Sequence, residues 1–222
     1  MLISYKHQFL FVHIYKTAGT SITGSLIPYA RPIDRLAYGF WPTRKATNAL
    51  NWMCNNQFNR LLTGYHKHAR AVDAQKRLPR SVFESLFKFA FVRNPWDWHV
   101  SLYFYIREAP KHRLHKKIKS MDFPDFIQWN IGQKPLRQMD FLTDAENRII
   151  VDYVGRYENL ESDLRYIQNK LDLKAGPLDR TNVSRKRVHP DYRKYFDSKS
   201  AELIASYFAP DIKAFGYDFD AG

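Results

Sequence analysis

The sequence predicts an α/β fold in which a central parallel sheet is flanked by helices. Short apolar runs of strand length alternate along the 222 residues with longer segments whose apolar residues recur at helical spacing. Strands separated by helices pair in parallel, and such sheets bind ligands at the carboxyl ends of their strands. No internal repeat and no Pro/Gly/Ser-rich linker interrupts the chain. We therefore expect a single domain over residues 1–222.

Three apolar runs predict the strands of this sheet. The run over residues 9–14 is rich in aromatic residues and is followed by a turn that contains a glycine. Residues 87–92 form a second run, and residues 151–156 form a third. Continuous apolar runs of about four to eight residues are typical of strands that are buried within a sheet.

Helices are expected between the strands. The first begins near Thr20 and ends before Pro28. Residues 43–62 carry apolar side chains at near-helical spacing and are followed by Gly64, so a long helix with a C-terminal glycine is expected there.

Further helices are expected after the second strand. Asn94 and the proline after it supply an N-cap and a first-turn proline for a helix over residues 96–108. Residues 159–171 are expected to form the helix after the third strand. Residues 200–208 are expected to form the last helix, which Pro210 ends.

Composition excludes several classes of protein. Hydrophobic residues make up 45% of the chain and aromatic residues 16%, which excludes a disordered or low-complexity protein. The 35 Lys and Arg residues exceed the 22 Asp and Glu residues, and the net charge of +13 points to an anionic partner or ligand. The single cysteine, Cys54, cannot form an internal disulfide or a cysteine-based zinc site.

The first residues of the chain do not resemble a targeting segment. Their apolar run is interrupted by Lys6, His7, His13 and Lys16, which does not fit the core of a signal peptide and is far too short for a membrane span. We therefore expect a soluble, cytoplasmic protein without a transmembrane segment. A peripheral association with a membrane stays open.

The loop over residues 15–21, between the first strand and its helix, is a candidate anion site. A helix N-terminus presents unpaired backbone N–H groups and a partial positive charge. Gly19 allows a ligand to approach the backbone, and Lys16 adds a charge, so the loop suits a phosphate or sulfate. It is not a Walker A loop, because the lysine stands three residues before the glycine. The alternative is an ordinary strand-to-helix turn with a solvent-facing lysine.

A second candidate anion site follows the second strand. Arg93 stands at the carboxyl end of this strand, and Ser101 lies on the following helix. A guanidinium can bind a phosphate through two hydrogen bonds, and a hydroxyl supplies a further donor. Two anion sites at one sheet edge suggest a ligand with two separated anionic groups. The alternative is an ion pair between Arg93 and Asp97, with Ser101 as an ordinary helical serine.

Together these segments resemble the sulfotransferase superfamily. Residues 11–21 are similar to the family's loop for the 5′-phosphosulfate, and residues 91–101 are similar to its 3′-phosphate site. Several C-terminal segments resemble the carbohydrate branch, which includes heparan sulfate 2-O and Golgi-type enzymes (sulfotransferase family 2) and has bacterial members; they are residues 153–160, 182–185, 207–212 and 215–217. The resemblance covers nearly the whole chain.

The resemblance implies a P-loop-like three-layer α/β fold and a sulfotransferase activity. The donor would be 3′-phosphoadenosine 5′-phosphosulfate, and the product adenosine 3′,5′-bisphosphate. The acceptor would be a hydroxyl or amine, most naturally of a carbohydrate. A sulfuryl group carries less charge than a phosphoryl group, so no metal is expected to be required, and no acidic pair is placed to hold one. Asp97 is interpreted as a first-turn residue that suits the helix dipole.

The resemblance also assigns roles to residues. It places the donor in contact with Lys16, Thr17, Ala18, Gly19, Thr20, Ser21, Arg93 and Ser101. Lys16 would in addition be catalytic, because it would stabilise charge on the leaving group. Arg185 joins the donor site if residues 181–187 form a lid over the adenosine, although their composition fits a solvated basic loop equally well. Tyr15 stands where related loops more often carry proline, which would make this loop more mobile.

A general base is still needed, because a sugar hydroxyl is a poor nucleophile at neutral pH. The branch places a histidine upstream of the 3′-phosphate strand, and His68 best matches that position. Its neighbour His66 is assigned to substrate binding. The alternative for any of the eight histidines is a surface or capped imidazole.

Residues 111–119 are dense in cations and admit two interpretations. The first is a solvated charged face. The second is a subsite for an anionic oligosaccharide, with Lys116 and Lys117 as substrate-binding residues. Four aromatic residues are candidates for stacking on sugar rings, although most aromatic residues must belong to the core: Trp98, Tyr103, Tyr105 and Trp129.

Two other functions are considered. A nucleotide or small-molecule kinase would show a Walker A end and metal-holding acids, and the sequence shows neither. A module that binds nucleic acid or another polyanion would explain the charge of +13, but not two anion loops at strand ends. Nucleic acid is therefore not expected as a partner.

Overall fold

In the computed structural model, which describes residues 1–38, 58–174 and 187–220, the three predicted strands lie side by side in one sheet. They are β2 (Phe9–Val12), β3 (Phe87–Val92) and β4 (Tyr153–Arg156). All three run parallel, with Phe11 opposite Phe89 and Phe89 opposite Tyr153. The predicted α/β fold class, with helices flanking a central sheet, is confirmed.

One strand was not predicted. β1 (Leu2–Ser4) pairs with β2 at the edge of the sheet and runs antiparallel to it, so the strand order is β1-β2-β3-β4. The predicted parallel sheet therefore carries an additional antiparallel strand at this edge. Four residues separate β1 from β2, which suffices for a hairpin, whereas parallel neighbours need a long crossover.

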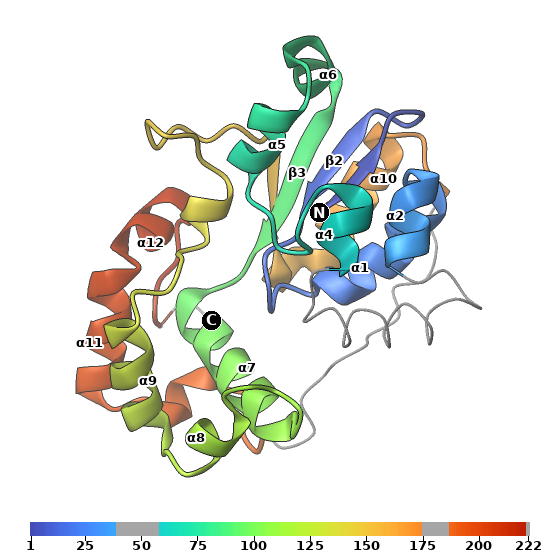
Figure 1. Ribbon diagram of the computed structural model, residues 1–222. Coiled ribbons are helices and arrows are strands. Elements are labelled where there is room, and N and C mark those ends of the chain that lie inside the picture. The colour runs from blue at the N-terminus through green and yellow to red at the C-terminus, as the bar shows by residue number, and fades with distance from the viewer. Residues whose placement is uncertain (39–57, 175–186, 221–222) are drawn as a thin grey trace. The chain divides into compact units, whose positions relative to one another are not determined.

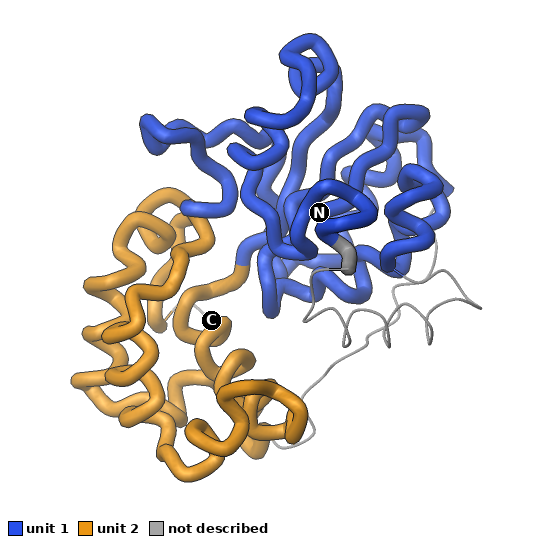
Figure 2. The backbone as a smooth tube through the Cα atoms, in the orientation of Figure 1, with its two compact units in different colours: residues 1–92, 140–181 blue, residues 93–139, 182–222 orange. Residues whose placement is uncertain are grey.

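Two compact units make up the chain (Figure 2). The first contains residues 1–92 and 140–181, including the whole sheet, and the second contains residues 93–139 and 182–222. Each unit is described by itself. A single sulfotransferase domain over residues 1–222 stays a prediction.

The core of the first unit lies on one face of the sheet. Because side chains alternate along a strand, Phe9 and Phe11 of β2 face the same side, and Phe89 and Phe91 of β3 join them. Two helices cover this face, α1 (Gly19–Leu26) and α10 (Leu160–Lys170), and α10 is seen behind the strands in Figure 1. Their buried residues in this core are Ile22, Leu26, Leu164 and Ile167.

Several helices lie where capping residues and apolar spacing in the sequence predicted them. α7 (Pro95–Glu108) begins where predicted, and the Asn94 side chain accepts hydrogen bonds from the N–H groups of Trp96 and Asp97. α11 (Ser198–Tyr207) is also confirmed. Pro210 was misinterpreted, however. It lies in the first turn of α12 (Ala209–Phe215), where a proline is tolerated because its missing N–H would have no partner there.

The predicted helix over residues 43–62 lies mostly outside the described residues, as does Cys54. Its end is described as α4 (Phe58–Thr63), followed by Gly64 with a φ of +82°. That φ is in the left-handed region, which a glycine at a helix C-terminus adopts without strain.

The remaining helices were not predicted. Most are only five to seven residues long, which is too short for a helical period to show in the sequence. They are α2 (Pro32–Ala37), α5 (Ala71–Arg77), α6 (Arg80–Ser85), α8 (His115–Lys119) and α9 (Phe123–Gly132), with short 3₁₀ turns at Ile27–Tyr29, Met139–Phe141, Tyr157–Asn159 and Tyr192–Tyr195. None of the described helices is long and apolar enough to cross a membrane.

Candidate functional site

The loop between β2 and α1 turns sharply. Lys16 has a φ of +65° and Ala18, the N-cap residue of α1, has a φ of +59°. Residues other than glycine rarely adopt such φ angles. Left-handed residues in a loop turn consecutive backbone N–H groups toward a common side. The Thr17 hydroxyl donates to the Ile14 carbonyl at 2.9 Å, which holds the turn from inside. The loop therefore has the backbone form of an anion site.

A close contact with His13 explains the glycine in this loop. A Cβ atom on Gly19 would lie less than 3.0 Å from three atoms of the His13 ring. That ring is buried, with 3% of the residue exposed, and it stacks on Phe11. Since the ring cannot retreat into the core, only glycine fits at position 19.

The loop residues differ in what they can offer a ligand. Lys16 and Thr20 are half-buried, so their side chains can reach a ligand, whereas Ser21 is buried. The Thr17 hydroxyl is already used inside the loop, so Thr17 can offer only its backbone N–H as a donor. The first N–H groups of a helix have no partner within the helix, which leaves those of α1 suited to an anion.

The fold brings His68 to this loop from 55 residues away. Its Nδ1 donates a hydrogen bond to the carbonyl oxygen of His13 at 2.8 Å, because a carbonyl can only accept. The two imidazole rings meet edge to face at 4.6 Å, and the Tyr15 ring lies 6.0 Å from the His68 ring. With the proton fixed on Nδ1, the lone pair is on Nε2, which is the form a general base needs.

His68 and its neighbour His13 are held in the neutral form. Loss of hydration lowers the pKa of His68, and it outweighs the hydrogen bond to the His13 carbonyl, which raises it. His68 is nevertheless an exposed residue, as His66 is, so hydration limits this lowering. Burial, together with the closeness of His68, lowers the pKa of His13 well below its ordinary value. Both rings are therefore neutral at pH 7.

His66 lies apart from these contacts. Its side chain is exposed, and its carbonyl accepts a hydrogen bond from the N–H of Ala69 at 3.1 Å, so residues 66–69 form a turn. His66 and His68 therefore lie on a turn and not on an extended segment, and the contacts described for His68 are not shared by His66.

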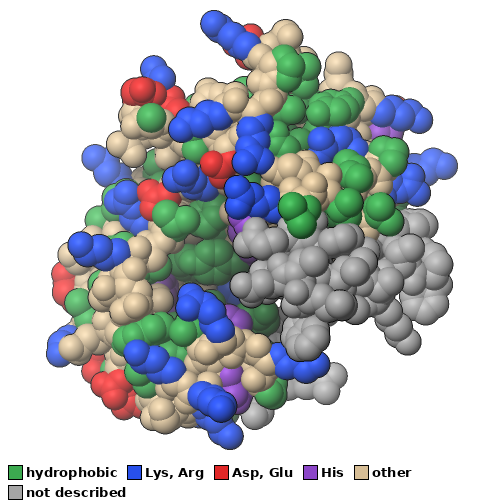
Figure 3. Space-filling view, in the orientation of Figure 1, with side chains coloured by type: hydrophobic (Ala, Val, Ile, Leu, Met, Phe, Trp, Pro, Cys, Tyr) green, Lys and Arg blue, Asp and Glu red, His purple; other side chains and the backbone are tan. Residues whose placement is uncertain are grey.

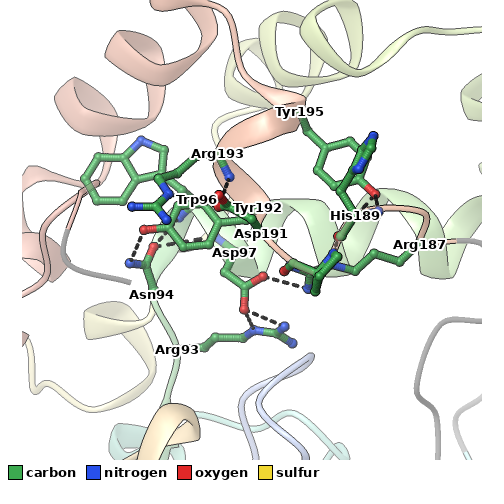
Figure 4. A network of polar contacts seen from close by, with 11 residues as sticks. Arg93, Asn94, Trp96, Asp97, Arg187, His189, Asp191, Tyr192, Arg193 and Tyr195 are labelled. Atoms are coloured by element: carbon green, nitrogen blue, oxygen red, sulfur yellow. Dashed lines mark hydrogen bonds and ion pairs between the residues drawn. The ribbon is translucent and has the colours of Figure 1, made fainter.

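In the second unit, Arg93 makes the ion pair that the alternative interpretation named. Its Nε and Nη2 lie 2.7 Å and 2.6 Å from Oδ2 of Asp97 (Figure 4). The other carboxylate oxygen, Oδ1, lies 2.8 Å from Nη1 of Arg187. One carboxylate thus stands between two guanidinium groups, and the cluster of Arg93, Asp97 and Arg187 keeps a net positive charge. Asp97 does more than suit the helix dipole, since it orients both arginines.

Arg187 is the residue that sequence reasoning missed here. It also donates hydrogen bonds to the carbonyls of His189, at 2.9 Å, and Pro190, which hold its guanidinium beside Asp97. Arg185, the residue assigned from the sequence, lies outside the described residues. Both belong to one basic segment, and nothing local in that segment distinguishes them.

Ser101 lies one helical turn beyond Asp97 on α7 and is half-buried. Residues four apart on a helix share a face, so Ser101 stands on the side of α7 that carries the arginine cluster. The shared role of Arg93 and Ser101 stays a prediction, and the structure adds Asp97 and Arg187 as partners on the side of Arg93.

The basic segment is partly helical, and its lysines are accessible. Lys116 and Lys117 are exposed on α8, and the Lys117 ammonium lies 4.8 Å from the centre of the Trp129 ring. Figure 3 shows basic side chains spread over the face in view. Trp98 and Tyr103 are buried and cannot stack on a sugar; Tyr105 is exposed and Trp129 is half-buried.

Metal ligands are not gathered in the described part of the chain. Within it, no group of three or more His, Cys, Asp or Glu side chains could hold a metal ion. Asp97, the acidic residue nearest to the candidate anion sites, forms ion pairs with Arg93 and Arg187.

The chain is similar to known proteins over most of its length. The family model described as "Sulfotransferase family" matches residues 1–218. An uncharacterized protein of Archaeoglobus fulgidus is 30% identical over 121 residues, which are 54% of this chain and 93% of that protein. No solved structure matches the chain at a significant level.

Proposed function

Because the chain belongs to the sulfotransferase family, we propose that it transfers a sulfuryl group from 3′-phosphoadenosine 5′-phosphosulfate to a hydroxyl or amine of a carbohydrate. Family membership supports the sulfotransferase activity. The donor, the acceptor class and the residue roles are the parts that we add. The observation that carries them is the placement of His68 beside residues 15–21, with its proton on Nδ1 and its lone pair on Nε2.

The loop would bind the reacting end of the donor. The N–H groups at the start of α1 and the half-buried Thr20 would hold the 5′-phosphosulfate. Lys16 would lie near the oxygen that bridges phosphorus and sulfur. Negative charge on this oxygen grows as its bond to sulfur breaks, so the lysine would stabilise the transition state more than the bound donor.

The other end of the donor would be held in the second unit. Arg93 and Ser101 would bind the 3′-phosphate, and Arg187 is oriented by the same carboxylate as Arg93. Two guanidinium groups against one carboxylate leave a net charge of +1, which favours an anionic ligand such as a phosphate.

The reaction needs one proton transfer. Nε2 of His68 would take the proton from the acceptor hydroxyl while the acceptor oxygen forms its bond to sulfur. The bond between sulfur and the bridging oxygen breaks, and adenosine 3′,5′-bisphosphate leaves with the electron pair. The chemistry assigned to these residues calls for no metal.

Nucleotide binding tests the proposal. Adenosine 3′,5′-bisphosphate should raise the unfolding temperature more than ATP with magnesium or duplex DNA at the same concentration, because a ligand that binds the folded state more tightly stabilises it more. Preferential stabilisation by ATP with magnesium would support a kinase instead. Preferential stabilisation by DNA would support a polyanion-binding module.

Arg93→Ala sharpens this test. The variant should lose charge-assisted hydrogen bonds of about 1.5–3 kcal/mol each, which is roughly tenfold to a hundredfold in affinity. The loss should appear for adenosine 3′,5′-bisphosphate and not for adenosine 5′-phosphate in calorimetric titration. Arg80→Ala, which removes an exposed ion pair with Glu84, is the control. Equal weakening of both nucleotides by Arg93→Ala would reject the 3′-phosphate assignment.

We propose that the basic segment guides an anionic acceptor. Replacing Lys116, Lys117 and Lys119 with glutamine should raise the acceptor KM and flatten its dependence on salt, because exposed charges attract over only about 8–10 Å at ordinary ionic strength. The donor KM should not change. A variant with the same loss of charge elsewhere, at the exposed Lys6, Lys76 and Lys213, is the control. If both variants have the same acceptor KM, the segment is a solvated face.

A further inference from the structure

We propose that Gln138 and Asp211 are positioning residues that hold Arg93 ready for the 3′-phosphate. The inference rests on the proposed function, since it assigns a purpose to the surroundings of the proposed phosphate-binding arginine. All three residues belong to the second unit, and the first two lie far from Arg93 in the sequence.

Gln138 binds the main chain of Arg93 on both sides. Its Oε1 accepts a hydrogen bond from the Arg93 N–H at 2.8 Å, and its Nε2 donates one to the Arg93 carbonyl at 2.7 Å. This is the paired pattern that a neighbouring strand would supply, made by one side chain 45 residues away, directly after the end of β3. Gln138 is fully buried, so water does not compete for these bonds.

Asp211 holds the segment that carries Gln138. One carboxylate oxygen accepts a hydrogen bond from the Gln138 N–H and the other accepts one from the Met139 N–H, both at 2.9 Å. Asp211 lies in the first turn of α12 and is fully buried. The carboxylate therefore sets the position of the glutamine backbone, and the glutamine side chain sets the position of Arg93.

The arrangement fixes Arg93 at both ends of the residue. Gln138 fixes its main chain, while Asp97 fixes its guanidinium. A two-bonded contact between a guanidinium and a phosphate requires a defined geometry, and a side chain that is ordered before the ligand arrives loses less entropy on binding. If Gln138 and Asp211 served only folding, their loss would affect the binding of adenosine 3′,5′-bisphosphate and of adenosine 5′-phosphate equally. The proposed role affects the 3′-phosphate selectively.

Gln138→Met separates these roles, because methionine has a similar length and no amide. We expect its affinity for adenosine 3′,5′-bisphosphate to fall about tenfold, with the affinity for adenosine 5′-phosphate within about twofold of wild type. Asp211→Asn changes the residue on α12 that holds the Gln138 backbone, and it should reduce the preference for adenosine 3′,5′-bisphosphate by a smaller factor. Gln133→Met, at the exposed end of α9, should change neither affinity. Calorimetric titration gives the affinities, and thermal unfolding shows that each variant is folded.

The outcomes distinguish the inference from the function on which it rests. If wild type prefers the bisphosphate and both Gln138→Met and Asp211→Asn keep that preference, the positioning role is rejected and the proposed function stands. A loss of stability without a change in the ratio of the two affinities also rejects it. If wild type shows no preference for the 3′-phosphate, the proposed function is rejected and the inference with it.

Discussion

Replacing His68 with alanine is expected to lower kcat by about 10²- to 10⁴-fold, the usual contribution of a general base. The affinity for adenosine 3′,5′-bisphosphate should stay unchanged, because His68 would act on the acceptor proton. Steady-state kinetics with the donor and a glycan acceptor give kcat, and calorimetric titration gives the affinity. The exposed His66, replaced in the same way, is the matched control and should cost less. A His68→Ala enzyme with wild-type turnover, or less impaired than His66→Ala, would overturn the assignment.

The pH profile supplies a second readout of the same prediction. A base works in its neutral form, and the pKa of His68 is lowered, so kcat/KM should stay level below pH 6.5 and fall only at more acidic pH. This acidic limb should be absent in His68→Ala.

The stability of the fold should also depend on pH, because burial lowers the pKa of His99 to about 4. The folded state then binds fewer protons than the unfolded state, and stability falls as the pH drops below about 6.5. Circular dichroism at each pH separates unfolding from titration of the base.

Gly19→Ala is expected to remove most of the donor affinity. The added methyl group would overlap the buried His13 ring, so the loop or the ring must shift, and forcing extra volume into such a site costs about 1–3 kcal/mol. The shift displaces the N–H groups at the start of α1, and we expect the affinity for the bisphosphate to fall at least about tenfold. Calorimetric titration and thermal unfolding measure the two effects.

Gly24→Ala on the same helix is the matched control. A Cβ atom at Gly24 meets nothing within 4 Å, and alanine is the better helix former by roughly 0.5–1 kcal/mol. This variant should bind the bisphosphate like wild type and unfold at a slightly higher temperature. Wild-type affinity in Gly19→Ala would show that the contact with His13 does not shape the loop.

Much of the fold was predictable from short stretches of sequence. The strand β3 matches its apolar run. A strand that is buried on both faces of a sheet appears in the sequence as a nearly continuous apolar run, so it can be identified without knowing which strands pair with it. The start of α7 follows from Asn94 and the proline after it, since a cap acts on N–H groups only two or three residues away. For the same reason, the loop of residues 15–21 could be named as a candidate anion site from its own residues.

The partners of the site residues were decided by the tertiary structure. His68 meets the carbonyl of His13 across 55 residues, and Gln138 meets Arg93 across 45. Such contacts form only when separate elements pack, so no local pattern indicates them. Packing also decided that Arg187 pairs with Asp97. For Arg93, the sequence alone allowed two interpretations, a phosphate-binding residue and an ion pair with Asp97. The sequence by itself determined the three parallel strands, the capped helix and the residue types of the two candidate anion sites, because these depend on burial and on neighbours along the chain. Only the tertiary structure decided which histidine contacts His13 and Tyr15 beside the loop and which side chains hold Arg93, because these contacts join residues far apart in the chain.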